Sequence, residues 1–342
     1  MSGHDFWKER RVLITGINGF VGGNLAKACC TEGAAVVGLI RNLQKDSLLF
    51  HEGLADSVHI ILGDITDKEL LRKVIVEERI TCCFHLAAQV EVGIAKTYPF
   101  LTWETNVRGT YALMEAIRDS GEKIQATIIA SSDKAYGNYE KEKLPYREDY
   151  PLIPVYPYDV SKACADMIAR SYASDLYSLP IIITRFCNLY GPGQMNFSAL
   201  IPDAVRSALG YSRFIPRGNG LHIRDYMYIG DAVSLYMLLA EALSSNRELG
   251  GEIFNAGTNQ PRLVKDVVQE IYTILNREED YRQIDPLWAD RQAAGEIEFQ
   301  FMDYEKVNRR FGWKPSVDFN SGLKETIQWY EQYFRRNYGT HG

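Results

Sequence analysis

Residues 130–137, with the sequence ASSDKAYG, place two hydroxyls, a carboxylate, an ammonium and a phenol next to one another. They directly follow the apolar run ATII (126–129), which is typical of a buried strand. Hydroxyl, carboxyl and amine groups held together at one strand end can bind a polar substrate and move its protons. Ser132, Asp133 and Lys134 are therefore a candidate reaction centre, and the alternative is a polar loop that faces solvent.

A second candidate pair lies in the segment PYDVSKACADMIARSYA, where Tyr158 precedes Lys162 by four residues. Residues at this spacing share one face of a helix. A lysine ammonium near a phenol favours the phenolate, which can take a proton from a substrate hydroxyl. Such pairs also arise by chance on surfaces, so the catalytic interpretation depends on a cofactor site elsewhere in the chain and on Ser132 upstream.

A cofactor site is indicated near the N-terminus by VLITGINGFVGGNLAKA, in which Gly16, Gly19 and Gly22 separate a predicted strand from a predicted helix. Glycine lets the backbone approach a pyrophosphate, and the helix N-terminus supplies N–H donors. This strand-turn-helix context at the start of a β-α pattern predicts dinucleotide binding, with a simple tight turn as the alternative.

The ends of the next predicted strands refine this expectation, because ligands of open parallel sheets lie at the carboxyl ends of the strands. Arg41 stands where an acidic residue would bind a ribose diol, and it can pair with a 2′-phosphate instead. This favours NADP over NAD, although Arg41 could also stack on adenine or face water. Asp64 is expected near the adenine, and Ala87 and Ala88 are small enough to let the cofactor pass.

Short β-branched runs alternate with helical patterns over the first 190 residues. The expected strands are RVLITG from Arg11, AAVVGLI to Ile40, HIILGD to Asp64, TCCFHLAA to Ala88, ATIIASS and LPIIITRF. Helical patterns such as GGNLAKACCTEG and NVRGTYALMEAIRDSG, closed by Gly121, lie between them. This alternation predicts an α/β fold, a doubly wound parallel sheet of the Rossmann type.

The alternation of strand and helix patterns becomes less regular after Gly191, where the chain is rich in Gly, Pro and Arg. A helix near Asp231–Leu243 and a strand EIFNAG are expected next, and SGLKETIQWYEQYFRR reads as an amphipathic helix. We therefore expect a dinucleotide-binding domain at 1–190, with 222–256 returning to it. A smaller substrate-binding lobe is expected at 191–221 and 257–342.

Composition limits the function classes. A net charge of −6 over 342 residues argues against a nucleic-acid partner. The six cysteines show no CxxC or His-rich spacing, so no metal site is expected and the thiols suit a reducing cytosol. The N-terminal MSGHDFWKERR does not resemble a signal peptide, and no run of about 18 apolar residues predicts a membrane span. A cytoplasmic location is expected.

Several motifs together resemble the extended short-chain dehydrogenase/reductase family of nucleotide-sugar enzymes. They are TGxxGFVG, HLAAQ, SSDKAYG, YxxxK and NLYGPG, and RDYMYIGDAV and FGWKPSVDFNSGLKETIQWY fit the family's substrate lobe. The resemblance covers nearly the whole chain. Within the family, 4,6-dehydratases place an Asp-Glu pair after the Ser or Thr. The pair Asp133-Lys134 is most similar to the CDP-glucose 4,6-dehydratase branch.

The resemblance implies an NAD(P)-dependent NDP-hexose 4,6-dehydratase, a lyase. It would oxidise C4, eliminate water across C5–C6 and return hydride to C6, giving an NDP-4-keto-6-deoxy sugar. Ser132 would bind the 4-hydroxyl, with Tyr158 and Lys162 acting at C4. Asp133, kept protonated by burial, would donate to the departing C6 hydroxyl. Lys134 replaces the expected glutamate base, and its role as base or enolate stabiliser stays open.

The resemblance also implies the remaining contacts. For the dinucleotide, NAD or NADP held tightly, they are Gly16, Asn18, Gly19, Phe20, Val21, Gly22, Arg41, Asp64, Ile65, Leu86, Ala87, Ala88, Asn106, Ala130, Tyr158 and Lys162. For the nucleotide sugar they are Gln89, Ser132, Asn188, Asn196, Arg217, Arg224 and Arg291. The sequence carries no visible code for the nucleotide base or the hexose.

Two other functions fit parts of the pattern: a 4-epimerase that uses only Ser132, Tyr158 and Lys162, and a non-catalytic dinucleotide-binding protein. A homodimer is expected, because two predicted helices that pair across a two-fold axis in relatives carry apolar stripes. The stripes are Val107, Tyr111 and Met114 on one helix and Cys164, Met167 and Tyr172 on the other. They could equally belong to the core of a single chain.

Overall fold

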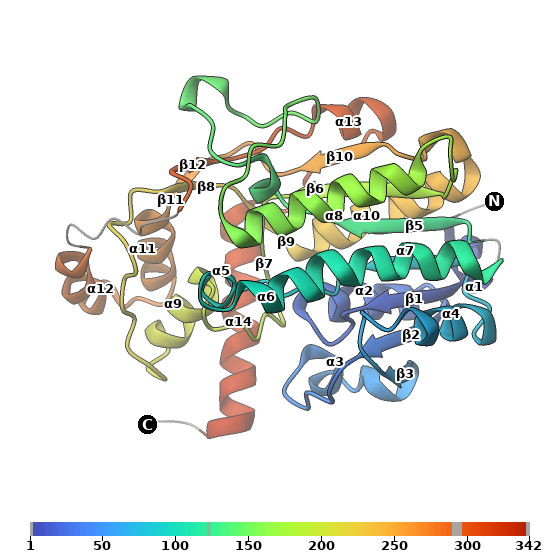
Figure 1. The fold of residues 1–342 in the computed structure, drawn as a ribbon. Helices are drawn as coiled ribbons and strands as arrows, with labels where there is room; N and C mark the ends of the chain where they lie inside the picture. The colour runs from blue at the N-terminus through green and yellow to red at the C-terminus, as the bar shows by residue number, and fades with distance from the viewer. Residues whose placement is uncertain (1–2, 122–123, 289–295, 340–342) are drawn as a thin grey trace. The chain divides into compact units, whose positions relative to one another are not determined.

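The structure is a computed structural model that describes residues 3–121, 124–288 and 296–339 (Figure 1). The chain forms two compact units. The larger unit comprises 1–137, 148–186 and 232–256, and the smaller unit comprises 138–147, 187–231 and 257–342.

The larger unit is built on a seven-stranded sheet in the order β10-β6-β5-β4-β1-β2-β3. Its strands are β1 (Arg11–Thr15), β2 (Ala35–Ile40), β3 (His59–Leu62), β4 (Cys82–His85), β5 (Ala126–Ala130), β6 (Ile181–Phe186) and β10 (Ile253–Ala256). Every neighbouring pair is parallel. The predicted doubly wound fold is therefore confirmed. The order reverses between β1 and β4, where such sheets bind their ligands.

Apart from the partly exposed edge strand β3, the strands form because their apolar runs are buried. All six residues of β6 are buried, as are the last four of β1. A run of β-branched residues without polar alternation is typical of a parallel sheet covered by helices on both sides.

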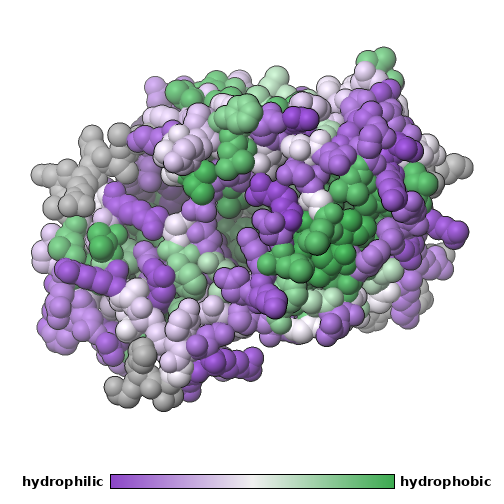
Figure 2. All heavy atoms as spheres, turned by 60° about the horizontal axis from the view of Figure 1, so that its bottom comes forward, coloured by the Kyte–Doolittle hydropathy of each residue, from purple (hydrophilic) through white to green (hydrophobic). Residues whose placement is uncertain are grey.

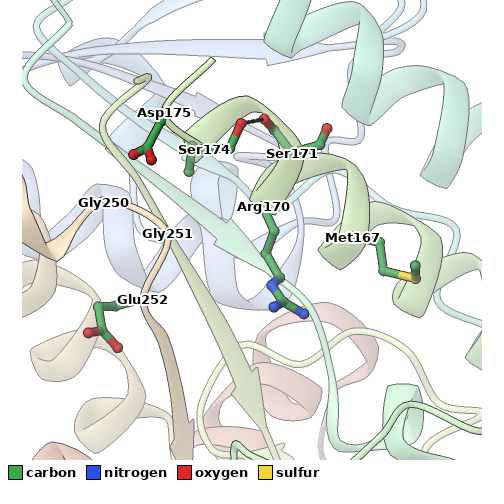
Figure 3. Close-up of a pocket in the computed structure, with 9 residues that line it drawn as sticks. Met167, Arg170, Ser171, Ser174, Asp175, Gly250, Gly251 and Glu252 are labelled. Atoms are coloured by element: carbon green, nitrogen blue, oxygen red, sulfur yellow. Dashed lines mark hydrogen bonds between the residues drawn. The ribbon is translucent and has the colours of Figure 1, made fainter. Parts of the chain in front are cut away.

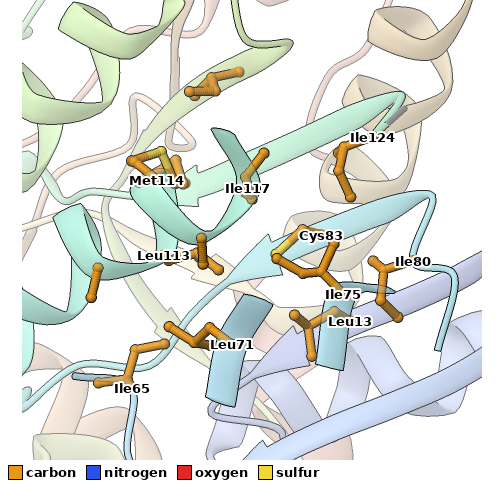
Figure 4. Packing of buried hydrophobic residues seen from close by; sticks show 14 of the residues in the cluster. Leu13, Ile65, Leu71, Ile75, Ile80, Cys83, Leu113, Met114, Ile117 and Ile124 are labelled. Carbon is orange, nitrogen blue, oxygen red and sulfur yellow. The ribbon is translucent and has the colours of Figure 1, made fainter. Parts of the chain in front are cut away.

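Helices cover both faces of this sheet. They are α1 (Gly3–Lys8), α2 (Phe20–Thr31), α3 (Leu48–His51), α4 (Lys68–Glu77), α5 (Val92–Thr97), α6 (Pro99–Thr102), α7 (Gly109–Ser120), α8 (Pro157–Ala173) and most of α10 (Ile229–Ser245). A π-helical segment, η2 (Trp103–Arg108), joins α6 to α7, and η1 (Leu54–Ser57) and η5 (Arg247–Leu249) are short 3-10 helices. Side chains of α4 and α7, such as Leu71 and Leu113, pack with Leu13 and Cys83 of the sheet (Figure 4).

The smaller unit has its own aromatic core, in which Tyr190, Phe319, Tyr330 and Phe334 are buried. Its strands are β7 (Asn188–Tyr190), β8 (Ile223–Arg224), β9 (Tyr226–Tyr228), β11 (Arg262–Leu263) and β12 (Phe299–Gln300). Its helices are η4 (Lys141–Lys143), α9 (Leu200–Ala208), α11 (Val264–Ile274), α12 (Glu278–Ile284), η6 (Asp285–Leu287), α13 (Glu305–Phe311) and α14 (Phe319–Tyr338). The amphipathic C-terminal helix is thus confirmed as α14.

Within the described residues, no helix is both long and apolar enough to cross a membrane. The same part of the chain contains no group of three or more His, Cys, Asp or Glu side chains that could hold a metal ion. The face shown in Figure 2 mixes hydrophilic and hydrophobic residues, and its broadest hydrophobic area lies right of centre in the view.

Candidate active site

The turn between β1 and α2 is shaped by three glycines. Gly16 has φ +75°, and a Cβ atom there would lie 2.9 Å from the backbone nitrogen of Ala87. A Cβ atom at Gly22 would lie 2.3 Å from the carbonyl oxygen of Gly16. Because no side chain fits at either position, the turn stays tight and its backbone stays open to a ligand.

This cradle fits the pyrophosphate of a dinucleotide. Gly19 precedes α2 as its N-cap residue, and no side chain caps the helix. The first N–H groups of α2 therefore point toward the end of β1, where a phosphate would accept their hydrogen bonds. Phe20 and Val21, both half-buried, begin the helix. The residues present thus suit the predicted cofactor.

The other predicted cofactor residues on β2 and β3 differ in exposure. Arg41 directly follows β2 and is exposed, and the Asn18 amide donates to the Asn42 carbonyl oxygen 3.4 Å away. Asp64 is also exposed and accepts hydrogen bonds from the nitrogen and hydroxyl of Thr66 at 2.9 and 2.8 Å. Burial raises the pKa of Asp64, but the Thr66 bonds and the charge of Arg41 outweigh it and leave that pKa lowered.

Three further predicted residues serve the packing of the protein itself. Ile65 is buried in the core, and its Cγ2 atom would lie 2.7 Å from a Cβ atom placed on Gly109. Asn106, in η2, accepts from the Gln89 nitrogen at 2.7 Å and donates to the Gln89 oxygen at 3.0 Å. The Gln89 side chain is held between Thr102 and the Glu91 carbonyl. Any role of Ile65 and Asn106 toward the cofactor, or of Gln89 toward a sugar, stays a prediction.

The Ser-Asp-Lys cluster forms a short 3-10 helix, η3 (Asp133–Tyr136), at the carboxyl end of β5. Ser132 caps it, because its hydroxyl accepts a hydrogen bond from the Lys134 nitrogen at 3.2 Å. The same hydroxyl donates to Oδ1 of Asp133 at 2.9 Å. Asp133 is only 3% exposed and Lys134 is half-buried, so the cluster is not a loop facing bulk solvent.

Tyr158 and Lys162 lie in the first turns of α8, which begins at Pro157, a residue suited to the first helical position. Both side chains are buried, and the Ser132 hydroxyl is near enough to the Tyr158 phenol to act against the rise in its pKa. Burial is the largest cause that raises the pKa of Tyr158, and the Asp133 carboxylate adds to it. The expected depression of this pKa by Lys162 is therefore not seen, because burial dominates.

Lys162 itself is tuned by its surroundings. Burial lowers the pKa of its ammonium to about 8, against the opposing charge of Asp166. Its Nζ atom donates to the Ala130 carbonyl oxygen at 2.6 Å. Lys162, Tyr158 and Ser132 thus converge at the ends of β5 and α8 in the larger unit.

A buried ion pair beneath this cluster was missed by the sequence analysis. Arg185 of β6, 1% exposed, makes two hydrogen bonds to the Asp166 carboxylate at 2.8 and 3.0 Å. Its guanidinium lies 4.7 Å from the ring centre of Tyr136, whose hydroxyl donates to Asn255 at 2.8 Å. An arginine inside the apolar run IIITRF was the available signal, because a buried charge requires a partner.

The predicted substrate residues of the smaller unit are placed as follows. The Asn188 amide donates to the Asp225 carbonyl oxygen at 3.3 Å, and Asn196 accepts from the Ser198 nitrogen at 2.9 Å. Arg217 is exposed and donates to the Ser198 carbonyl oxygen. Arg224 is buried and donates to the carbonyl oxygens of Ile223 and Glu298. Arg291 lies outside the described residues.

A surface hollow of about 690 Å³ lies at the opposite end of α8 (Figure 3). Arg170, Asp175, Glu252 and the Gly250-Gly251 turn line it. Arg170 follows Tyr158 by twelve residues, which is roughly 18 Å along a helix. The hollow is therefore separate from the candidate catalytic residues.

Comparison with known proteins identifies the family. The model for "GDP-mannose 4,6 dehydratase" matches residues 13–326. The chain belongs to the GDP-mannose 4,6-dehydratase family. This confirms the predicted resemblance to nucleotide-sugar 4,6-dehydratases.

Several GDP-mannose 4,6-dehydratase family relatives align over nearly the whole chain. The dTDP-glucose 4,6-dehydratase 1 of Escherichia coli strain K12 is 32% identical, over 94% of this chain and 92% of its own. The CDP-glucose 4,6-dehydratase of Salmonella typhimurium is 29% identical, over 97% and 93%. A dTDP-glucose 4,6-dehydratase from Bacillus anthracis, solved in complex with NAD, has a TM-score of 0.80 at 30% identity, over 94% and 97%.

Relatives in the GDP-mannose 4,6-dehydratase family also differ in length. The chain spans only 48% of two trifunctional proteins from Arabidopsis thaliana that carry a UDP-glucose 4,6-dehydratase in their names.

Proposed function

We propose that this protein is an NDP-hexose 4,6-dehydratase, a lyase that removes one water from a nucleotide-linked hexose and yields the 4-keto-6-deoxy sugar. The observation that carries the proposal is the buried carboxylate of Asp133, 2.9 Å from the Ser132 hydroxyl, in a chain of this family. An epimerase needs no ionisable group at that place, whereas loss of a hydroxyl needs an acid.

The oxidation at C4 is assigned to three side chains. The Ser132 hydroxyl, which lies near the Tyr158 phenol, orients the 4-hydroxyl of the sugar. In its phenolate form, Oη of Tyr158 takes the proton of that hydroxyl and becomes a neutral phenol. The Lys162 ammonium, one helical turn away, stabilises the phenolate before this transfer. A bound nicotinamide dinucleotide supplies the hydride acceptor and donor that the oxidation and the final reduction require.

The elimination is assigned to the two residues after Ser132. In its protonated form, Asp133 donates that proton to the departing C6 hydroxyl, and its burial keeps water away from this carboxyl group. Lys134 is half-buried beside it and acts at C5, either as the base or by stabilising the enolate. Ser132 holds both of these residues, because its oxygen accepts a hydrogen bond from the backbone nitrogen of Lys134 and its hydroxyl donates one to Asp133.

NAD binding is supported by the glycine cradle and by the relative solved with NAD. We further propose that Arg41 lets the site take NADP, because its exposed guanidinium follows β2 and can pair with a 2′-phosphate. Titration of the nucleotide-free protein with both dinucleotides tests this. Arg41→Ser should weaken NADP binding and leave NAD binding nearly unchanged, and equal loss for both would refute the role.

We assign nucleotide-sugar binding to the smaller unit, where Arg217 is exposed and can bind a diphosphate.

A homodimer is proposed through α7 and α8. Tyr111 and Met167 are 43% and 61% exposed and support it, whereas Met114 is fully buried in the chain's own core. Light scattering of the parent and of a Tyr111→Glu/Met167→Glu double variant tests the assembly.

The function itself is tested by incubating the protein with CDP-, GDP-, UDP- and dTDP-sugars and detecting products by mass. One substrate should lose a mass equal to water and, in D₂O, should gain deuterium at C5. A product of unchanged mass with an inverted C4 would instead identify a 4-epimerase, and no conversion across the panel would favour a binding protein.

A further inference from the structure

His85, the last residue of β4, is 4% exposed, and both of its ring nitrogens face hydroxyl groups. Nδ1 lies 2.9 Å from Oγ1 of Thr15, and Nε2 lies 3.0 Å from Oγ1 of Thr110. A neutral imidazole has one donor nitrogen and one acceptor nitrogen, so the two threonines must differ in what they offer.

The partners of Thr15 decide what Nδ1 does. Its Oγ1 atom accepts hydrogen bonds from the backbone nitrogens of Leu86 and Ala87, each at 3.2 Å, and Leu86 shares its N–H with the Thr15 carbonyl oxygen at the same distance. Backbone N–H groups can only donate, so both lone pairs of this oxygen are in use. The hydroxyl proton of Thr15 then points to Nδ1, which must be the unprotonated nitrogen.

The partner of Thr110 decides what Nε2 does, independently of Thr15. Oγ1 of Thr110 lies 2.6 Å from the carbonyl oxygen of Asn106. A carbonyl oxygen can only accept, so Thr110 donates to it and receives the Nε2–H of His85. Both ends therefore specify the same neutral tautomer, with the proton on Nε2.

A second proton has no place at this site. A proton on Nδ1 would face the doubly occupied Thr15 oxygen and would leave the Thr15 hydroxyl without an acceptor. Burial first, and the nearby positive charge of Lys162 second, lower the pKa of His85 to about 3. The ring is thus an uncharged linker with a fixed direction of hydrogen bonding.

The linker joins two parts of the proposed active site. Thr15 immediately precedes Gly16 of the dinucleotide cradle. At the other end, Asn106 donates to Oγ of Ser161 at 2.9 Å, and Ser161 donates to the carbonyl oxygen of Tyr158 at 2.7 Å. Buried hydrogen bonds, joined through the main chain and side chain of Asn106, therefore connect Thr15 beside the cradle to helix α8.

We infer that His85 is a positioning residue which, as the neutral Nε2–H tautomer, holds the dinucleotide cradle and the Tyr158 helix in register. The inference rests on the proposed function for the role of Tyr158, but not for the tautomer or for dinucleotide binding. Neither of these requires a sugar substrate, so each can fail or hold separately from the dehydratase assignment.

The tautomer is tested by ¹⁵N NMR of the histidine-labelled protein without sugar, with the His85 signal assigned by its loss in His85→Gln. Long-range couplings between ring nitrogens and carbon-bound protons distinguish the two tautomers and the imidazolium. The inference requires a single neutral Nε2–H form at pH 7. An Nδ1–H form, an averaged signal or a charged ring would overturn it.

The positioning role is tested with two matched threonine variants. Thr110 and Thr326 are both 1% exposed, and each hydroxyl donates at 2.6 Å to the carbonyl four residues earlier in its helix. Only Thr110 also contacts His85. Thr110→Val should weaken NAD binding by about 5-fold, the loss expected for one buried hydrogen bond, while Thr326→Val should not. Equal NAD affinities in the two variants would show that the link has no positioning role.

Replacing the ring itself gives a conservative rescue. The side-chain amide of His85→Gln offers one acceptor and one donor, whereas His85→Leu offers neither. The glutamine variant should bind NAD within about 3-fold of the parent and the leucine variant at least about 10-fold more weakly, each measured on protein whose thermal melt shows a folded state. Similar losses in both folded variants would contradict the inference.

Discussion

Lys162 donates a hydrogen bond from Nζ to the main-chain oxygen of Ala130 across 2.6 Å, at the carboxyl end of β5. This contact fixes the ammonium close to the Ser-Asp-Lys turn, and burial lowers its pKa to about 8. The charge to which we assign a catalytic role is therefore present at neutral pH but is lost in mildly alkaline solution.

The pH dependence of turnover follows from this pKa. Because the ammonium loses its proton as the pH rises through about 8, kcat/KM should fall on the alkaline side of that value. Lys162→Arg keeps a charge at all accessible pH values, so its residual activity should lack this limb. Lys162→Met should lower kcat by at least about 100-fold at any pH. Identical alkaline limbs in the parent and the arginine variant would rule out Lys162 as the titrating group.

The glycine cradle makes a prediction about cofactor affinity. A Cβ atom at Gly16 would meet the Ala87 backbone at 2.9 Å, so Gly16→Ala must displace the turn. We expect NAD affinity to fall by at least about 10-fold in a fluorescence titration. Gly53 is a matched control, because its φ of +67° is similar but nothing lies within 4 Å of its Cβ position. Gly53→Ala should cost about 1 kcal/mol of stability from backbone strain and leave NAD binding unchanged. A similar affinity loss in both variants would point to strain rather than to the cradle.

The buried histidine makes a prediction about acid stability. The pKa of His85 is about 3 in the folded chain, against about 6.5 for an unperturbed histidine in the unfolded chain. The His85 ring thus binds a proton in the unfolded state but not in the native state. The free energy of unfolding therefore decreases as the pH falls below about 6.5. Between pH 7 and pH 5 this amounts to about 2 kcal/mol in the free energy of unfolding.

Urea denaturation at both pH values measures this contribution. His85→Gln should lose it, whereas His59→Gln should not, because the His59 side chain is 59% exposed. The account of His85 as a permanently neutral ring would be wrong if all three proteins lost the same stability on acidification.

Much of the fold could be predicted from local sequence. The β-branched runs before Gly16 and after Pro180 are buried on both sides of a parallel sheet. The pattern of apolar residues along the chain and the turn residues that flank each run are sufficient to locate such strands. Gly121 ends α7 with φ +68°, as its place after a helical run indicates. The place of Ser132 at the carboxyl edge of the sheet also follows, because it comes directly after a predicted strand.

The polar network beneath the site could not be predicted in the same way. Arg185 and His85 each stand alone in an apolar strand, and sequence shows only that they need partners, not that these are Asp166, Thr15 and Thr110. These partners come from distant segments of the chain and are chosen by tertiary packing. For the same reason, the sequence did not reveal that Asn106 holds the backbone of Gln89.

The central claim is that the Asp133 carboxyl expels the terminal hydroxyl of the sugar, and mass-detected water loss by Asp133→Asn tests it most directly. Asp159→Asn is the matched control, since Asp133 and Asp159 both raise the pKa of Tyr158 but only Asp133 contacts the Ser132 hydroxyl. The account predicts that the Asp133 variant releases water at least about 100-fold more slowly than the parent, with the Asp159 variant close to parental. Water loss by Asp133→Asn at the parental rate would contradict it.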